Sequence, residues 1–290
     1  MKDGEHKRKM TFAKDAKEFW RRFKKNRGGV FGLYLLIFIT AIAIFAPLIA
    51  PYDPFALVAD AFVPPNTKFP MGTDHIGRDI YSDVIWGTRV SIIVGFLSAL
   101  TAASIGIILG PVSGYFGGHL DDVIMRVTEF FQVLPRLLLA LVIVALMGGS
   151  MWNVILVIGL LSWPTTARIL RAQFFTLKQR AFVEAAKSIG LGTAGIIFLE
   201  ILPNAISPVI IQISLEAANA ILLESMLSFL GLGDPGQMSW GYMLNSAQRY
   251  LRISWWMAAF PGLAILLTVM ASNLVGDGLN DALNPRLKER

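Results

Sequence analysis

The sequence predicts an all-α polytopic membrane protein with six transmembrane helices and both termini in the cytoplasm. Of its 290 residues, 54% are hydrophobic and only 16% are charged, whereas soluble domains carry about 25% charged residues. Several apolar runs of about 20 residues are long enough to cross the bilayer hydrocarbon as helices. The chain contains no cysteine, which excludes disulfides and thiolate metal sites.

Six apolar segments are predicted to span the membrane, and charged loops separate them. They occupy residues 30–50, 90–120, 130–147, 152–170, 205–230 and 253–276. The chain is accordingly divided into a basic amphipathic N-terminal segment (1–29), the first helix (30–50), an external loop (51–89), a five-helix core (90–276) that includes a cytoplasmic loop (171–204), and a cytoplasmic tail (277–290).

The distribution of Lys and Arg predicts which side of the membrane each loop faces. Twenty of these residues fall in the two terminal segments and in the loops predicted to lie on the same side of the membrane as the termini. Five fall in the loops on the opposite side. Because cytoplasmic loops carry the excess of positive charge, both termini and the loop 171–204 are predicted to be cytoplasmic. An even number of spans agrees with this orientation.

The basic N-terminal segment is predicted to contain an amphipathic helix. Phe12, Phe19, Trp20 and Phe23 recur at helical spacing among lysines and arginines, a pattern typical of helices that lie on anionic lipid. The adjoining span favours lipid over the alternative, a basic arm that binds nucleic acid. The segment also resembles a signal peptide, but its length and the long apolar run after it favour an uncleaved anchor.

The second span carries a stripe of small residues at every fourth position. Gly106, Gly110, Gly114 and Gly118 lie on one face of a helix, where another backbone can approach closely. We therefore expect a helix-packing surface, with a pore-lining role as the alternative.

No catalytic or nucleotide-binding motif is recognised. Gly231, Gly233 and Gly236 spell GxGxxG, but the pattern follows an apolar helix and contains Pro235, so a turn is predicted rather than a dinucleotide site. The patterns GxxxxGK[ST], HExxH and GxSxG are absent, and the three histidines are scattered. The chain is predicted not to be an enzyme and to hold no metal.

Three ionisable residues lie inside predicted spans and away from their ends, where charge is costly and commonly functional. Glu216 and Glu224 are eight residues apart on one helix, and Arg136 in the third span is able to pair with one of them. Two interpretations stay open. The three residues line the solute path or its gate, or Glu216 is hydrogen-bonded within the bundle while Glu224 touches water at the outer end.

The cytoplasmic loop between the fourth and fifth spans is predicted to be ordered. Residues 181–189 are predicted to be helical, and the glycines that follow end this helix. Residues 196–202 are predicted to form a second short helix, which ends at Pro203. The small residues Ala185 and Ala186 leave room for another surface, and Gly190 is expected to make the turn with a positive φ.

This loop resembles the EAA loop of permease subunits in ATP-binding-cassette importers, through which ATPase subunits are coupled. The pattern EAA, a glycine four residues later and then I-x-L-P is matched at Glu184, Ala185, Ala186, Gly190, Ile201 and Pro203. One departure is Glu200, where members of the family usually have His or Arg.

Other stretches are similar to the C-type permease of dipeptide, oligopeptide and nickel importers. They are APLIAPYDP (46–54), MGTDHIGRDIYS (71–82), ESMLSFLGLG (224–233), SWGYML (239–244) and GDGLNDALNPRL (276–287). The resemblance implies a type I importer permease (MetI-like) fold in the inner membrane of a prokaryote. It also implies a second related permease, two cytoplasmic ATPase subunits that hold ATP and Mg²⁺, and an extracytoplasmic solute-binding protein.

Peptides are the expected cargo, with nickel and oligosaccharides as alternatives. An ion-coupled secondary transporter is a hypothesis from another class, but such proteins usually contain internal repeats, and none is evident. A membrane-embedded enzyme is disfavoured by the missing catalytic motifs.

Overall fold

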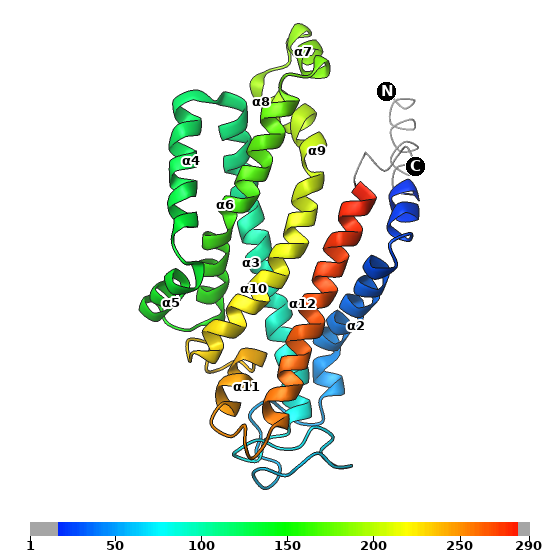
Figure 1. Cartoon of the computed structure of the whole chain (residues 1–290), viewed down its shortest axis with the longest axis vertical. Coiled ribbons are helices and arrows are strands. Elements are labelled where there is room, and N and C mark those ends of the chain that lie inside the picture. Colours follow the sequence, from blue (N-terminus) through cyan, green and yellow to red (C-terminus); the bar gives the residue numbers. More distant parts are fainter. Residues whose placement is uncertain (1–16, 284–290) are drawn as a thin grey trace.

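The computed structural model describes residues 17–283, which form a bundle of long helices with short helices at both ends (Figure 1). The helices, in chain order, are α2 (Arg27–Ile49), α3 (Ile80–Phe116), α4 (Gly118–Val133), α5 (Arg136–Met147), α6 (Met151–Leu177), α7 (Ala181–Ser188), α8 (Thr193–Gly195), the π-helix η1 (Ile196–Ile201), α9 (Leu202–Ala205), α10 (Ser207–Phe229), α11 (Trp240–Ala247) and α12 (Trp256–Leu283).

Five helices are long and apolar enough to cross a membrane, namely α2, α3, α6, α10 and α12. The sixth candidate is the pair α4 and α5, which is bent by 90°. The third span is therefore a broken one, and the prediction of a single helix over residues 130–147 is wrong. Pro135 supplies the reason, because a residue that precedes proline avoids the helical region and Leu134 is extended, with φ −77° and ψ 133°.

Several helix boundaries in the structure differ from the predicted ones, because capping residues set where a helix begins and ends. The external loop ends at residue 79 rather than 89, since the Asp79 side chain accepts a hydrogen bond from the Ser82 backbone N–H and starts α3. At its other end α3 stops at Gly117, whose φ is +69°. The last helix, α12, extends to Leu283, so the predicted tail 277–290 begins as helix.

The longest helix, α3, packs along α6 through three of the predicted glycines. A Cβ at Gly106 would lie 2.6 Å from the Thr166 side chain, and a Cβ at Gly110 would lie 2.6 Å from the Ala167 carbonyl oxygen. Gly114 is equally close to α6. The prediction that Gly118 is a fourth member of the stripe is wrong, because Gly118 starts α4 with a φ of +56° and has open space around it.

The first span packs against the last one at a similarly short distance. A Cβ on Gly32 of α2 would lie 2.6 Å from the Leu274 Cβ of α12. The described part of the basic segment, residues 17–23, is helical, and Phe23 is only 2% exposed because its ring lies against Gly278. Phe23 thus packs on protein rather than on lipid, whereas Phe12 lies outside the described residues.

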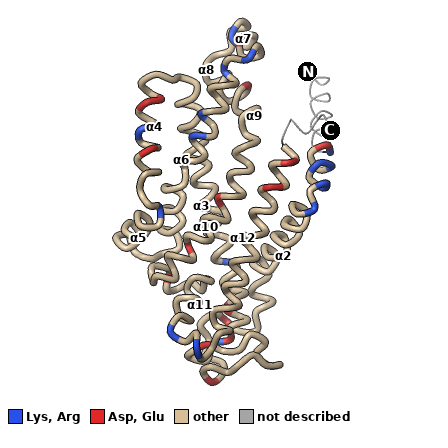
Figure 2. The backbone as a smooth tube through the Cα atoms, viewed as in Figure 1, with Lys and Arg blue, Asp and Glu red and all other residues tan. Residues whose placement is uncertain are grey.

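Many of the charged residues lie towards the two ends of the bundle, and fewer lie between them (Figure 2). At one end lie residues 17–25, α7 and the chain between α7 and α10. At the other end the loop 51–79 folds over α11 and the start of α12 (Figure 1). The long apolar middle matches the hydrocarbon thickness that spanning helices must cover.

Candidate functional site

The predicted ordered loop is a compact unit with its own apolar core. Val183 and Ala186 of α7 are buried together with Ile197 and Ile201 of the π-helix, and this cluster continues into Leu170 of α6. The loop is therefore packed onto the end of a spanning helix.

Gly190 makes the turn after α7, and its φ is +82°, which confirms the expected positive value. Only glycine adopts this conformation at little cost. The space around the position is open, since nothing lies within 4 Å of a Cβ built there. Any substitution at Gly190 therefore acts through backbone strain alone.

The residues that match the family pattern divide between an outer and an inner face of the loop. Glu184, Ala185 and Pro203 are outside, whereas Ile201 is fully buried and Ala186 is 6% exposed. The expectation that Ala186 leaves room for a partner is wrong, because its methyl group packs inside the loop. Ala185 is the exposed one of the two alanines.

The second short helix differs from the prediction at Pro203. The chain forms a π-helix over Ile196–Ile201 and continues into α9, with Pro203 in its first turn. Proline has no N–H and clashes with an ordinary preceding turn, and the wider π turn accommodates it. Pro203 therefore shapes this helix rather than ending it.

Three exposed apolar side chains on this loop were not anticipated. Ile189 is 84% exposed, Leu199 is 68% exposed and Phe198 is 57% exposed. Phe198 and Leu199 lie on the opposite side of the helix from the buried residues Ile196, Ile197 and Ile201. Apolar residues all round this short helix are the sequence signal that could have revealed the exposed pair. Exposed apolar patches of this kind mark interaction surfaces.

Ion pairs and hydrogen bonds fix the base of the loop to the neighbouring helices. Arg171 of α6 donates two hydrogen bonds of 2.6 Å to the Asp121 carboxylate of α4, which also accepts one from Ser113 of α3. Lys178 Nζ donates to the carbonyl oxygens of Gly114 and Tyr115, at 2.9 and 3.3 Å. These bonds satisfy carbonyls at the end of α3 and tie three helices together.

The structure brings Arg136 and Glu216 together but leaves Glu224 apart. The Arg136 guanidinium donates from Nη2 to the Glu216 carboxylate and to the Ser162 hydroxyl. Glu224 is 3% exposed and accepts a 2.7 Å hydrogen bond from Ser228. The interpretation in which Glu224 touches water is therefore wrong for this state, while Glu216 is hydrogen-bonded within the bundle.

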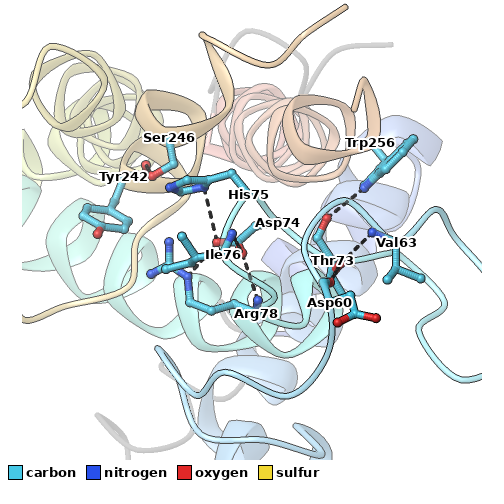
Figure 3. A network of polar contacts seen from close by, with 10 residues as sticks. All are labelled: Asp60, Val63, Thr73, Asp74, His75, Ile76, Arg78, Tyr242, Ser246 and Trp256. Atoms are coloured by element: carbon cyan, nitrogen blue, oxygen red, sulfur yellow. Dashed lines mark hydrogen bonds and ion pairs between the residues drawn. The ribbon is translucent and has the colours of Figure 1, made fainter. Parts of the chain in front are cut away.

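The external loop is held by a polar network around Asp74 (Figure 3). The Asp74 carboxylate accepts from the backbone N–H groups of Ile76 and Arg78 and from Arg78 Nε, the last at 2.6 Å. The indole N–H of Trp256 donates to the Thr73 carbonyl oxygen at 3.1 Å. These bonds fold the loop back on itself and fasten it to α12.

Aromatic rings complete the fold of residues 51–79, which we call the external cap after the side of the membrane predicted for it. His75 stacks on Tyr250 at 5.1 Å between ring centroids, and the Arg78 guanidinium lies over Phe55 and Tyr242. Burial opposes ionisation of Arg78, but the Asp74 carboxylate outweighs it and raises the pKa of the guanidinium above its usual value. The Arg78 guanidinium is thus paired with Asp74 in its charged form.

Comparison with known proteins identifies the family. Residues 102–289 match the family described as binding-protein-dependent transport system inner membrane component. Residues 16–68 match the N-terminal transmembrane domain of oligopeptide transport permease C.

Relatives are similar over nearly the whole chain. A dipeptide transport system permease protein of Haemophilus influenzae is 40% identical over 97% of this chain and 98% of its own length. A di/tripeptide permease protein of Pseudomonas aeruginosa is 40% identical, over 96% of this chain and 95% of its own. A dipeptide permease protein of Escherichia coli K12 is 43% identical, over 94% and 93%.

A solved structure agrees on the fold. A chain from the MetNI methionine ABC transporter, in an inward-facing conformation, superposes with a TM-score of 0.56 at 14% identity, covering 70% of this chain and 97% of that one. Together with the match over residues 102–289 and the near-complete relatives, this places the chain in the family of inner membrane components of binding-protein-dependent transport systems, as a permease subunit of the ATP-binding-cassette importer type.

Proposed function

We propose that this chain is one of two related permease subunits of an ATP-driven importer that carries dipeptides and other short peptides across the inner membrane of a prokaryotic cell. The observation that carries this proposal is the identity of 40% or more, over nearly the full length, to permease proteins named for dipeptides and tripeptides. It favours peptides over nickel or oligosaccharides as cargo.

In this proposal a solute-binding protein docks on the external cap and on α11, and both termini are cytoplasmic. The 20-to-5 split of Lys and Arg supports the orientation. Two cytoplasmic ATPase subunits supply the ATP and Mg²⁺ sites, since the sequence has no phosphate-binding loop. The second permease subunit supplies the other half of the path.

Coupling is assigned to the loop 178–206. Its exposed face, formed by Glu184, Ala185, Ile189 and Phe198, is the part available to an ATPase subunit. The apolar core that joins α7 to α6 carries the movement into the bundle. Glu200 replaces the basic residue usual in the family, and its backbone carbonyl accepts a 2.7 Å hydrogen bond from Asn204.

The test is reconstitution with the permease, ATPase and binding-protein subunits encoded beside this chain. We expect ATPase subunits to co-purify with it, and proteoliposomes to take up a radiolabelled dipeptide only when ATP and the binding protein are present. Uptake by this chain alone, driven by an ion gradient, would contradict the proposal. So would a complex that hydrolyses ATP in response to nickel or oligosaccharide but not to peptide.

A further inference from the structure

The broken span has an exposed polar face. Asp122, Arg126 and Glu129 of α4 lie at positions i, i+4 and i+7, which places them on one side of the helix. All three are exposed, with side-chain exposures of 84% for Arg126 and 60% for Glu129. Together with Arg168 and Arg171 of α6 they border a hollow of about 610 Å³.

This face cannot be covered by lipid tails at the level of the break. Gln132, Val133 and Pro135 are exposed where α4 ends and α5 turns away by 90°. Backbone groups without helical partners are tolerated at membrane depth only inside protein or beside water. The polar face of α4 and the break below it therefore adjoin an aqueous route or another protein subunit.

Arg136 follows the break along the chain. It is the first residue of α5, and its side chain is 32% exposed, whereas that of Glu216 is 5% exposed. The pair is therefore open to the outside of the chain on the arginine side and enclosed on the glutamate side. A solute that reaches the pair from outside this chain meets the guanidinium first.

The guanidinium also has unused donors. Arginine has five N–H groups, and both of the hydrogen bonds to Ser162 and Glu216 come from Nη2. Nε is buried and has no acceptor among the described residues. Nη1 takes part in neither bond, so the partly exposed guanidinium keeps N–H groups for another anion.

We propose that Arg136, held in place by Glu216, binds the carboxylate end of the transported peptide, a proposal that rests on the proposed function of peptide import. A peptide with a free C-terminus carries a carboxylate, and a guanidinium offers N–H groups in a fork that matches it. In the loaded state Arg136 binds the peptide carboxylate through N–H groups that Glu216 and Ser162 do not use, while Glu216 stays hydrogen-bonded to the guanidinium. Each charge keeps a partner throughout, which avoids the large cost of an unpaired ion in a dry environment.

The first test locates the peptide directly in the wild-type complex. A dipeptide that contains p-benzoylphenylalanine is supplied by the binding protein to the reconstituted transporter, which is then trapped with vanadate and illuminated. We expect cross-links in α5 and α10 next to Arg136 and Glu216, identified by mass spectrometry. Cross-links confined to helices remote from this pair would overturn the proposal.

The second test removes both charges without leaving either one unpaired. The double variant Arg136→Gln with Glu216→Gln should assemble and retain ATPase activity stimulated by the loaded binding protein. Its dipeptide uptake should fall about 10- to 100-fold, in line with the usual strength of hydrogen bonds to charged groups. The matched control is Glu18→Gln with Arg22→Gln, which neutralises an exposed pair near the N-terminus and should leave uptake unchanged.

The outcomes separate this proposal from the one on which it rests. If the wild-type complex imports no dipeptide, peptide import itself is wrong. If the wild type imports dipeptide and the double variant does so within twofold, the pair is only structural and this proposal alone fails. If the double variant does not assemble, the cross-links in the wild type decide.

Discussion

Gly190, Ala185 and Ala186 show how single residues shape the loop 178–206. The positive φ of Gly190 reverses the chain after α7, while Ala185 and Ala186 point to different sides of the same helix. Ala185 is exposed, and Ala186 is buried in the core of the loop. The same short pattern therefore leaves one alanine on the surface and packs the next one inside.

Replacing Gly190 by valine is expected to abolish coupled transport while the chain still inserts into the membrane. A β-branched residue in the left-handed region costs about 1–2 kcal/mol, and the turn will shift to relieve it. Gly192→Val is the matched control, because Gly192 has a φ of −66° and open space around it. Dipeptide uptake and ATPase co-purification are measured for both, and equal behaviour of the two variants would contradict a role for the turn.

Tryptophan substitutions distinguish the two faces of α7. Ala185→Trp should leave the loop folded and release the ATPase subunits, because the indole obstructs the outer surface. Ala186→Trp should disorder the loop itself, since overpacking a core commonly costs about 1–3 kcal/mol. Protease sensitivity of the loop, together with ATPase co-purification, tells these results apart. If the Ala185→Trp variant co-purifies with as much ATPase as the wild type does, this face is not the docking surface.

At the scale of helices, close backbone contact joins α3 to α6 along the glycine stripe, and a few hydrogen bonds add to it. Gly106, Gly110 and Gly114 each meet an α6 residue at a distance that leaves no room for a side chain. In a bilayer, where apolar surface has little tendency to separate from lipid, such tight packing is a main source of helix association. The Asp121–Arg171 pair then fixes α4 to this two-helix unit.

The variant Gly110→Leu should separate α3 from α6 and lower the yield and thermal stability of the assembled complex. The new side chain would collide with the Ala167 carbonyl oxygen and the Leu170 side chain, and a loss of about 2 kcal/mol or more is expected from such overpacking. Gly262→Leu in α12 serves as control, because nothing lies within 4 Å of a Cβ there. Equal melting temperatures for the two variants would refute the packing surface.

At the scale of the whole molecule, α3 links the two ends that we propose to be docking surfaces. With 37 residues it is about 55 Å long, which exceeds the hydrocarbon thickness. Its first turn follows Arg78 and Asp79 of the external cap, and its last carbonyls are bound by Lys178 at the base of the coupling loop. One rigid element thus connects the external cap with the loop proposed to contact the ATPase.

Single cysteines test the orientation of the molecule, because the native chain has none. Thr67→Cys and Gln248→Cys place thiols at exposed positions of one end, and Ser188→Cys places one at the other end. An impermeant maleimide added to intact cells should label positions 67 and 248 and spare position 188. Permeabilised cells provide the control for accessibility at 188. Labelling of 188 in intact cells would reverse the proposed topology.

The sequence by itself determined the membrane class, five of the spanning helices and the turn at Gly190. These features depend on local properties, namely the length of apolar runs and the backbone freedom of glycine, which are readable along the chain. The resemblance of the segment 184–203 to a known loop pattern likewise pointed to the family that the comparisons establish.

Only the tertiary structure decided which residues share a site. The Arg136–Glu216 pair joins positions 80 residues apart, and Glu224 was an equal candidate partner from spacing alone. Three other findings also depend on how neighbouring helices lie. They are the burial of Ala186, the position of Gly118 outside the stripe and the break at Pro135. Contacts between distant segments follow from packing in three dimensions, and the order of residues does not specify which charge a bent helix will present to which neighbour.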